Sequence, residues 1–214
     1  MKVLIAGAHG KTARRLTRML VADGHEVRGM VRKEEQSANV ESDGAEPVLV
    51  DLENAEADVG GAVAGCDAVV FAAGAGPGSG AARKETMDYG GAVRLIEAAE
   101  QHGAGRYLML SAVGAGDPEA GSEAMRPYLR AKAKADERLA ESGLAWTIVR
   151  PGGLTEDEGT GLVDAAASLG RRGEIPREDV AATFAAVLEA PNTVGKTFEL
   201  LSGETPIGEA IGKL

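Results

Sequence analysis

The sequence predicts an α/β protein: a doubly wound parallel sheet of about seven strands, with helices on both faces, in one domain covering residues 1–214. The first observation is an alternation of short apolar runs with longer helical patterns. The second is that several short runs consist almost entirely of Val, Ile, Leu and Ala, as in strands buried on both faces. The third is the composition, since 30 glycines and only 3% aromatic residues favour an aliphatic core and tight turns.

The expected strands are apolar runs of four to eight residues, spread along the whole chain. Between them lie segments of helical period, so that β and α units alternate, as parallel strands joined by helices require. The expected strands span residues 3–8, 26–32, 47–52, 68–73, 106–112, 145–150 and 196–201.

Four longer segments carry the helical period. In the segment 12–23, Leu16 and Leu20 fall on one apolar stripe, and Gly24 is a natural terminator. The segment 128–142 is rich in Ala, Lys, Arg, Glu and Leu, which are all good helix formers. Pro191 ends the segment 177–189. The expected helices span residues 12–23, 88–102, 128–142 and 177–189.

Three stretches fall between these elements and follow expected strands. Residues 74–82 and 114–126 are loop-like, and the segment at about 152–176 is only weakly periodic. Ligands of open α/β sheets bind beyond the carboxyl ends of the strands. We therefore expect both loops near the ligand, with residues 152–176 forming a small part that covers the substrate.

The first strand and helix are separated by a short glycine turn. Glycines at positions 7 and 10, with Ala13, allow backbone N–H groups and the positive end of the helix to approach a pyrophosphate. A purely structural turn is the competing interpretation, because this pattern alone is weak. Its place after a buried-type strand and at the start of a helix favours a dinucleotide site.

The end of the second strand distinguishes NAD from NADP. NAD-dependent enzymes usually place an acidic residue there, where it binds the ribose 2′-hydroxyl. This chain has Arg32, which suits the 2′-phosphate of NADP through charge-assisted hydrogen bonds. The alternative is a solvated arginine at a strand end. We expect NADP as cofactor, with NAD less favoured.

The next two strands end in residues that suit a bound nucleotide. Asp51 is a candidate acceptor for the adenine amino group, with Leu52 packing on the ring, although an acidic turn residue is an alternative interpretation. The small residues Ala72, Ala73 and Gly74 let the cofactor lie against the chain.

A candidate catalytic set follows the fifth strand. Ser111 closes that strand, and Tyr128 and Lys132 lie four residues apart on one face of a helix. A nearby ammonium group lowers the pKa of a phenol, which suits Tyr128 for proton transfer. We expect Lys132 also to hold the nicotinamide ribose, and Ser111 to orient a carbonyl oxygen.

These motifs resemble the short-chain dehydrogenase/reductase superfamily. The tract from Gly143 to Leu154 and the later Arg177-Glu178-Asp179-Val180-Ala181 are similar to its atypical branch of NmrA-like and NAD(P)H-binding proteins, often described as epimerases or dehydratases. The resemblance implies a Rossmann fold with NADP along the strand ends. It places the cofactor at Gly7, Gly10, Lys11, Arg32, Ala73, Ser111, Lys132 and Pro151. We also expect His9, Thr12 and Gly152 to contact the cofactor.

The sequence departs from the superfamily in two places. Ala13 replaces a third glycine, and His9 stands where Thr or Ser is common, facing the phosphates or serving as a turn residue. The atypical branch also resembles proteins that sense NADP without turnover. Only about 60 residues follow Pro151, too few for the substrate domain of sugar-nucleotide epimerases, so we expect a small substrate pocket.

Composition restricts the partners. The formal charge of −10 disfavours nucleic acid, and the single Cys66 and three scattered histidines offer neither an intramolecular disulfide nor metal-ligand spacing. No apolar run approaches the length of a transmembrane helix, so we expect a cytoplasmic protein without membrane contact. The sequence leaves open whether the protein is a monomer or a homodimer.

The sequence thus favours an NADP-dependent oxidoreductase that acts on a small carbonyl or related compound. The alternatives are a non-catalytic NADP(H)-sensing regulator and an NAD(P)-dependent epimerase or dehydratase. The presence of Ser111, Tyr128 and Lys132 together favours an active enzyme.

Overall fold

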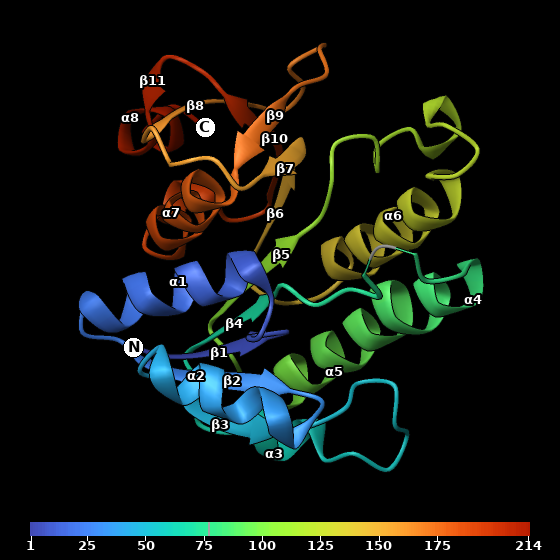
Figure 1. Cartoon of the computed structure of the whole chain (residues 1–214), viewed down its shortest axis with the longest axis vertical. Helices are drawn as coiled ribbons and strands as arrows, with labels where there is room; N and C mark the ends of the chain where they lie inside the picture. Colours follow the sequence, from blue (N-terminus) through green and yellow to red (C-terminus); the bar gives the residue numbers. More distant parts are fainter. Residues whose placement is uncertain (77) are drawn as a thin grey trace.

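The computed structural model describes residues 1–76 and 78–214, and its centre is a nine-stranded sheet (Figure 1). Seven neighbouring strands are parallel, in the order β3-β2-β1-β4-β5-β6-β10, and β8 and β11 add an antiparallel edge beyond β10. The predicted fold class is confirmed, with two more strands in the sheet than expected. The parallel strands are β1 (Lys2–Ala6), β2 (Glu26–Val31), β3 (Glu46–Leu49), β4 (Ala68–Phe71), β5 (Arg106–Leu110), β6 (Trp146–Pro151) and β10 (Lys196–Ser202).

Successive residues of the central strands bury their side chains on opposite faces of the sheet. On β1, Val3 and Ile5 belong to one apolar cluster, whereas Leu4 and Ala6 belong to another. All four are fully buried. The nearly continuous apolar runs therefore reflect helices packed on both faces of the sheet.

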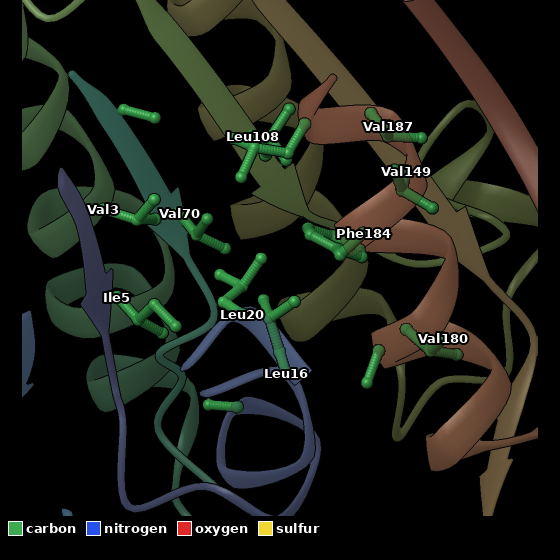
Figure 2. Packing of buried hydrophobic residues seen from close by; sticks show 14 of the residues in the cluster. Val3, Ile5, Leu16, Leu20, Val70, Leu108, Val149, Val180, Phe184 and Val187 are labelled. Carbon is green, nitrogen blue, oxygen red and sulfur yellow. The ribbon is translucent and has the colours of Figure 1, made fainter. Parts of the chain in front are cut away.

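The helices divide into two layers. On one face, α1 (Lys11–Ala22) and α7 (Arg177–Leu188) lie side by side, and Figure 2 shows Leu16, Leu20 and Phe184 between them and the sheet. On the other face lie α3 (Val59–Val63), α5 (Ala92–His102) and α6 (Arg126–Ala140). The short helices are α2 (Ser37–Ser42), α4 (Ala81–Arg83) and α8 (Ile207–Gly212), with 3-10 turns at Glu34–Gln36, Pro118–Ala120 and Pro191–Thr193.

The segment expected to cover the substrate differs from the prediction. Part of it, β8 (Leu162–Ala166), joins the main sheet antiparallel to β10 and pairs with β11 (Thr205–Pro206). The flanking β7 (Gly153–Thr155) and β9 (Glu174–Pro176) form a separate two-stranded sheet. Strands this short are too brief to show a hydrophobic period, so the sequence pattern missed them.

The helix expected from residue 88 begins earlier and irregularly. A π-helix occupies Lys84–Gly91 and continues directly into α5. The preceding glycine-rich loop was predicted at 74–82, and Pro77 within it lies outside the described residues. Wide turns of this kind often mark functional sites, because they redirect side chains that a regular helix would leave elsewhere.

Within the described ranges, no helix combines the length and the apolar character needed to cross a membrane.

Truncating the interface between α1 and α7 should destabilise the fold. Phe184 is 2% exposed, and we expect Phe184→Ala to lower the free energy of unfolding by about 3–5 kcal/mol through lost burial and a cavity. Val194→Ala, at a side chain that is 42% exposed, should change it by less than about 0.5 kcal/mol. Chemical denaturation of both variants measures the difference, and equal losses would contradict this packing.

Candidate functional site

The turn between β1 and α1 lies against the end of β4. Gly7 has a φ of +79°, which favours glycine, and a Cβ there would lie 2.6 Å from the Cα of Ala73. The N–H of Gly10 donates to the carbonyl of Gly7 at 2.8 Å and closes the turn. α1 then starts at Lys11 without a side-chain cap, so its first N–H groups have no partner within the helix. This arrangement suits a bound anion.

A cavity of about 240 Å³ extends from this turn across the ends of β1, β2 and β4. We call it the first cavity. Its apolar side includes Met30, Val50 and Met87. It brings together the following predicted cofactor residues: Gly7, His9, Gly10, Arg32, Asp51, Leu52, Ala72, Ala73 and Gly74.

Arginine side chains lie at the first cavity from two different elements. Arg32 follows β2, is exposed, and forms no ion pair with the carboxylates of residues 1–76 and 78–214. Arg83 reaches the same cavity from α4 and donates to Glu53, with the shorter hydrogen bond at 2.8 Å. Sequence reasoning missed Arg83, because its helix spans three residues and carries no periodic signal.

The other predicted residues at the first cavity have local partners. Oδ1 of Asp51 accepts the N–H of Glu53 at 2.9 Å, as an acidic turn residue does. Leu52 is buried and lines the cavity. His9 contacts the Asn39 side-chain amide through Nδ1 at 3.3 Å.

A second cavity of about 690 Å³ continues from the first. Both are lined by Gly10, Ala72, Ala73 and Gly74, so together they form one cleft along the carboxyl ends of the strands. The predicted residues Lys11, Thr12, Ser111, Tyr128 and Lys132 line the second cavity.

Tyr128 and Lys132 lie close together, as their spacing predicted. Nζ of Lys132 lies 5.9 Å from the ring centroid of Tyr128, and the Lys132 side chain is buried. Burial raises the pKa of the Tyr128 phenol well above its ordinary value, and the carboxylates of Asp88 and Asp136 raise it further. The expected lowering was therefore wrong: burial and the two carboxylates outweigh the nearby ammonium groups, and the phenol stays protonated.

Lys132 is held by two acceptors at the end of β5. Its ammonium group donates to the carbonyl of Leu110 at 2.8 Å and lies 3.9 Å from Oδ1 of Asp88. Burial lowers the pKa of Lys132, whereas the carboxylates of Asp88 and Asp136 raise it. The side chain is thus fixed with its remaining N–H groups available at the cavity.

Ser111 has a different partner from the one expected. Its hydroxyl donates to Oδ2 of Asp136 at 2.8 Å, and Arg150 donates to the same oxygen at 3.0 Å. A serine hydroxyl has one proton, which Ser111 gives to Asp136, so in this arrangement it can accept a further hydrogen bond but cannot donate one to a carbonyl. Asp136 follows Tyr128 and Lys132 at the same four-residue interval on α6, a signal that was visible in the sequence.

Asp88 is a buried carboxylate at the second cavity that sequence reasoning also missed. It lies in the π-helix and is 1% exposed. One oxygen accepts the N–H of Ala75 at 3.2 Å, and the other faces Lys132. An aspartate within an expected helix has no distinctive pattern, so only the tertiary structure places it beside Lys132.

Pro151 and Gly152 are not among the described residues that line either cavity. Pro151 pairs with β10, and a Cβ on Gly152 would lie 2.3 Å from the carbonyl oxygen of Gly173. Close packing of the chain explains this glycine. The prediction that these two residues contact the cofactor therefore has no support from the shape of the cleft.

A cluster of charges spans the entrance near α1. Glu156 accepts from Lys11 at 3.0 Å and from Arg177 at 2.7 Å, and lies 3.4 Å from Arg15. The hydrogen bonds from Arg177 and Lys11 lower the pKa of Glu156 to about 2. Lys11, expected at the cofactor, is therefore paired with a carboxylate in this structure.

The fold and the cleft together define a protein that binds a dinucleotide across the ends of a parallel sheet. Residues 7–191 match a family model described as NAD(P)H-binding, and the chain belongs to this NAD(P)H-binding family of the atypical short-chain dehydrogenase/reductase type. The matched residues include the described residues that line both cavities.

Individual relatives agree with this assignment. The chain is 46% identical over 215 residues to the uncharacterized sugar epimerase YhfK of Bacillus subtilis (strain 168), with both chains covered completely. A solved structure from Bacillus halodurans, described as a candidate NAD-dependent epimerase/dehydratase, is 44% identical with a TM-score of 0.96 and complete coverage of both chains. The oxidoreductase ylbE from Lactococcus lactis is 30% identical, with a TM-score of 0.87, and the match covers 100% of this chain and 96% of that one.

The contact between Gly7 and Ala73 predicts an unequal effect of two glycine substitutions. Gly24 has a φ of +83° with no atom within 4 Å of an added Cβ, so Gly24→Ala reports backbone strain alone, about 1 kcal/mol. Gly7→Ala adds a clash with backbone atoms, and we expect a further loss of about 1–3 kcal/mol and weaker NADPH binding.

Denaturation and NADPH titration of both variants measure these effects. Equal losses of stability in the two variants would contradict the close contact between the turn and β4.

Proposed function

We propose that this protein is an NADP-dependent oxidoreductase that acts on a small carbonyl compound. The observation that carries the proposal is the position of Tyr128 and Lys132. They line a cavity that directly continues the dinucleotide cleft, so a substrate there would lie between them and the end of the cofactor.

The residues of the chain suit this reaction. Nicotinamide cofactors supply or accept a hydride when bound. Tyr128, protonated because its pKa is raised, would donate a proton to the carbonyl oxygen of the substrate. Lys132, fixed by Leu110 and Asp88, would hold the ribose hydroxyls, and Ser111 would accept a hydrogen bond at the same edge.

The preference for NADP rests on Arg32. The first cavity would take the adenosine half, and Arg32 lines it with no ion pair within 4.0 Å among residues 1–76 and 78–214. The one acidic side chain among its described lining residues is Asp51, which comes from the turn after β3. A guanidinium group available at this position fits the 2′-phosphate.

An NAD(P)-dependent epimerase or dehydratase is the second candidate. It is favoured by the descriptions of the two Bacillus relatives. Such an enzyme restores its cofactor in each cycle, so it would convert a sugar substrate without net consumption of NADPH. A non-catalytic regulator would bind NADP(H) and show neither activity.

Replacing the phenol tests the oxidoreductase proposal. We expect the protein to oxidise NADPH with members of a panel of aldehydes, ketones and quinones, and Tyr128→Phe to lower kcat by about 10²–10⁴-fold. The affinity for NADPH should stay within about 2-fold, because the hydroxyl acts on the substrate.

Tyr89→Phe is the matched control, since Tyr89 is half-buried and not among the described residues that line the cavities. Loss of absorbance at 340 nm measures the rate. Tight NADPH binding without turnover of any carbonyl compound would argue for a regulator or an epimerase.

Replacing Arg32 tests the choice of cofactor. Arg32→Ala should raise the Kd for NADPH about 10-fold or more and leave the Kd for NADH within about 2-fold, because only NADPH carries the 2′-phosphate. Lys33→Ala is the control, since Lys33 is exposed and pairs with Glu35 at 3.2 Å. Fluorescence titration measures both constants, and an unchanged ratio of the two Kd values would refute the role of Arg32.

A further inference from the structure

The second cavity is positively charged, although the chain as a whole is acidic. Its described lining residues include the cations Lys11, Lys84, Lys132 and Arg177 and one acidic side chain, Asp88. The formal charge of the whole chain is −10. A cleft of opposite sign to the rest of the surface attracts anions and concentrates them at the site.

Three of the four cations have a carboxylate partner within 4.0 Å. Lys132 lies 3.9 Å from Asp88. Lys11 and Arg177 share Glu156, at 3.0 and 2.7 Å.

Lys84 is the exception. It is half-buried at the start of the π-helix and forms no ion pair within 4.0 Å among residues 1–76 and 78–214. Its ammonium group donates to the carbonyl of Gly76 at 2.8 Å and lies 5.1 Å from the ring centroid of Tyr128. An ammonium group has three donors, so the bond to Gly76 leaves N–H groups beside Tyr128.

We propose that the substrate of this cleft is a carbonyl compound that carries a carboxylate, and that Lys84 binds that carboxylate beside Tyr128. This rests on the oxidoreductase proposal above. The ammonium group of Lys84 carries a single charge and matches the single charge of a carboxylate, whereas a phosphate would bring up to two charges and suits a guanidinium fork better. Lys84 is therefore a specificity-determining residue.

Lys84 contacts other residues than those expected at the cofactor phosphates. The pyrophosphate belongs at the turn from Gly7 to Gly10 and the start of α1. Lys84 instead contacts the ring of Tyr128, which lies at the reactive end of the cleft in the proposed reaction. A ligand held by Lys84 would have its polar group next to the proton donor.

Paired acids and amides test this proposal in the full-length protein saturated with NADP⁺. The binding probes are benzoate with benzamide, pyruvate with pyruvamide, and 4-formylbenzoate with 4-formylbenzamide. We expect at least one acid to bind about 10-fold more tightly than its amide, and Lys84→Met to remove that difference. Lys84→Arg, which keeps the charge, should retain most of it.

Lys134→Met is the matched control, because Lys134 is exposed, pairs with Glu85 at 2.6 Å, and is not among the described lining residues. It should leave every affinity unchanged. Acids that bind no more tightly than their amides would overturn the proposal. A Lys84→Met variant that weakens NADP⁺ binding instead would assign Lys84 to the cofactor, and tighter binding of phenyl phosphate than of benzoate would assign a phosphate.

Steady-state turnover tests the carboxylate-binding role of Lys84 separately from the oxidoreductase activity. With NADPH, reduction of 4-formylbenzoate should show a KM about 10-fold below that of 4-formylbenzamide, with Lys84→Met raising the KM for the acid only. If acids bind preferentially but no carbonyl compound is reduced, the oxidoreductase proposal fails and the anion site stands. If both aldehydes are reduced with equal KM, the oxidoreductase proposal stands and Lys84 has no role in specificity.

Discussion

Burial of both faces of the parallel sheet is the constraint on which the rest of this protein depends. The side chains of β1 enter two separate apolar clusters, one against α1 and α7 and the other against α3, α5 and α6. Neither face can hold an unpartnered polar group without a large desolvation cost. Chemistry is therefore confined to the strand ends, where small residues such as Gly7, Ala73 and Gly74 leave a continuous cleft.

The reactive end of that cleft combines ionisable side chains that are themselves almost fully buried. Lys132, Asp88 and Asp136 are each 3% exposed or less, and every one of them has a partner of opposite charge or a hydrogen-bonded neighbour. Removing one member of such a set leaves another charge buried and unpaired, which is strongly destabilising. The network therefore fixes Lys132 and Ser111 in position and also sets the protonation state of Tyr128.

Much of the fold could be predicted because its signals are local. The seven parallel strands and four main helices have hydrophobic periods that single stretches of sequence display, and the structure shifts their ends by only a few residues. The antiparallel edge of β8 and β11 could not be predicted in this way. It depends on the free edge of β10, a partner distant in sequence, and β11 has only two residues.

The candidate site divides in the same manner. The glycine turn, Arg32 and the pair of Tyr128 and Lys132 could be found from the sequence, because each rests on spacing within one turn or one helix. Arg83 and Asp88 lie in a three-residue helix and a π-helix, which give no regular pattern. Pro151 and Gly152 were expected at the cofactor, but they pack against β10 and Gly173.

The sequence by itself determined the parallel α/β architecture, the place of the dinucleotide turn and some of the residues that face the cleft, because periodicity and short-range spacing encode them. Only the tertiary structure decided which charges meet. It placed Asp88 beside Lys132 and Asp136 beneath Ser111, raised the pKa of Tyr128 and left Lys84 without a carboxylate among residues 1–76 and 78–214. Electrostatics at a site depends on burial and on distances between elements that are remote along the chain, and no local pattern carries that information.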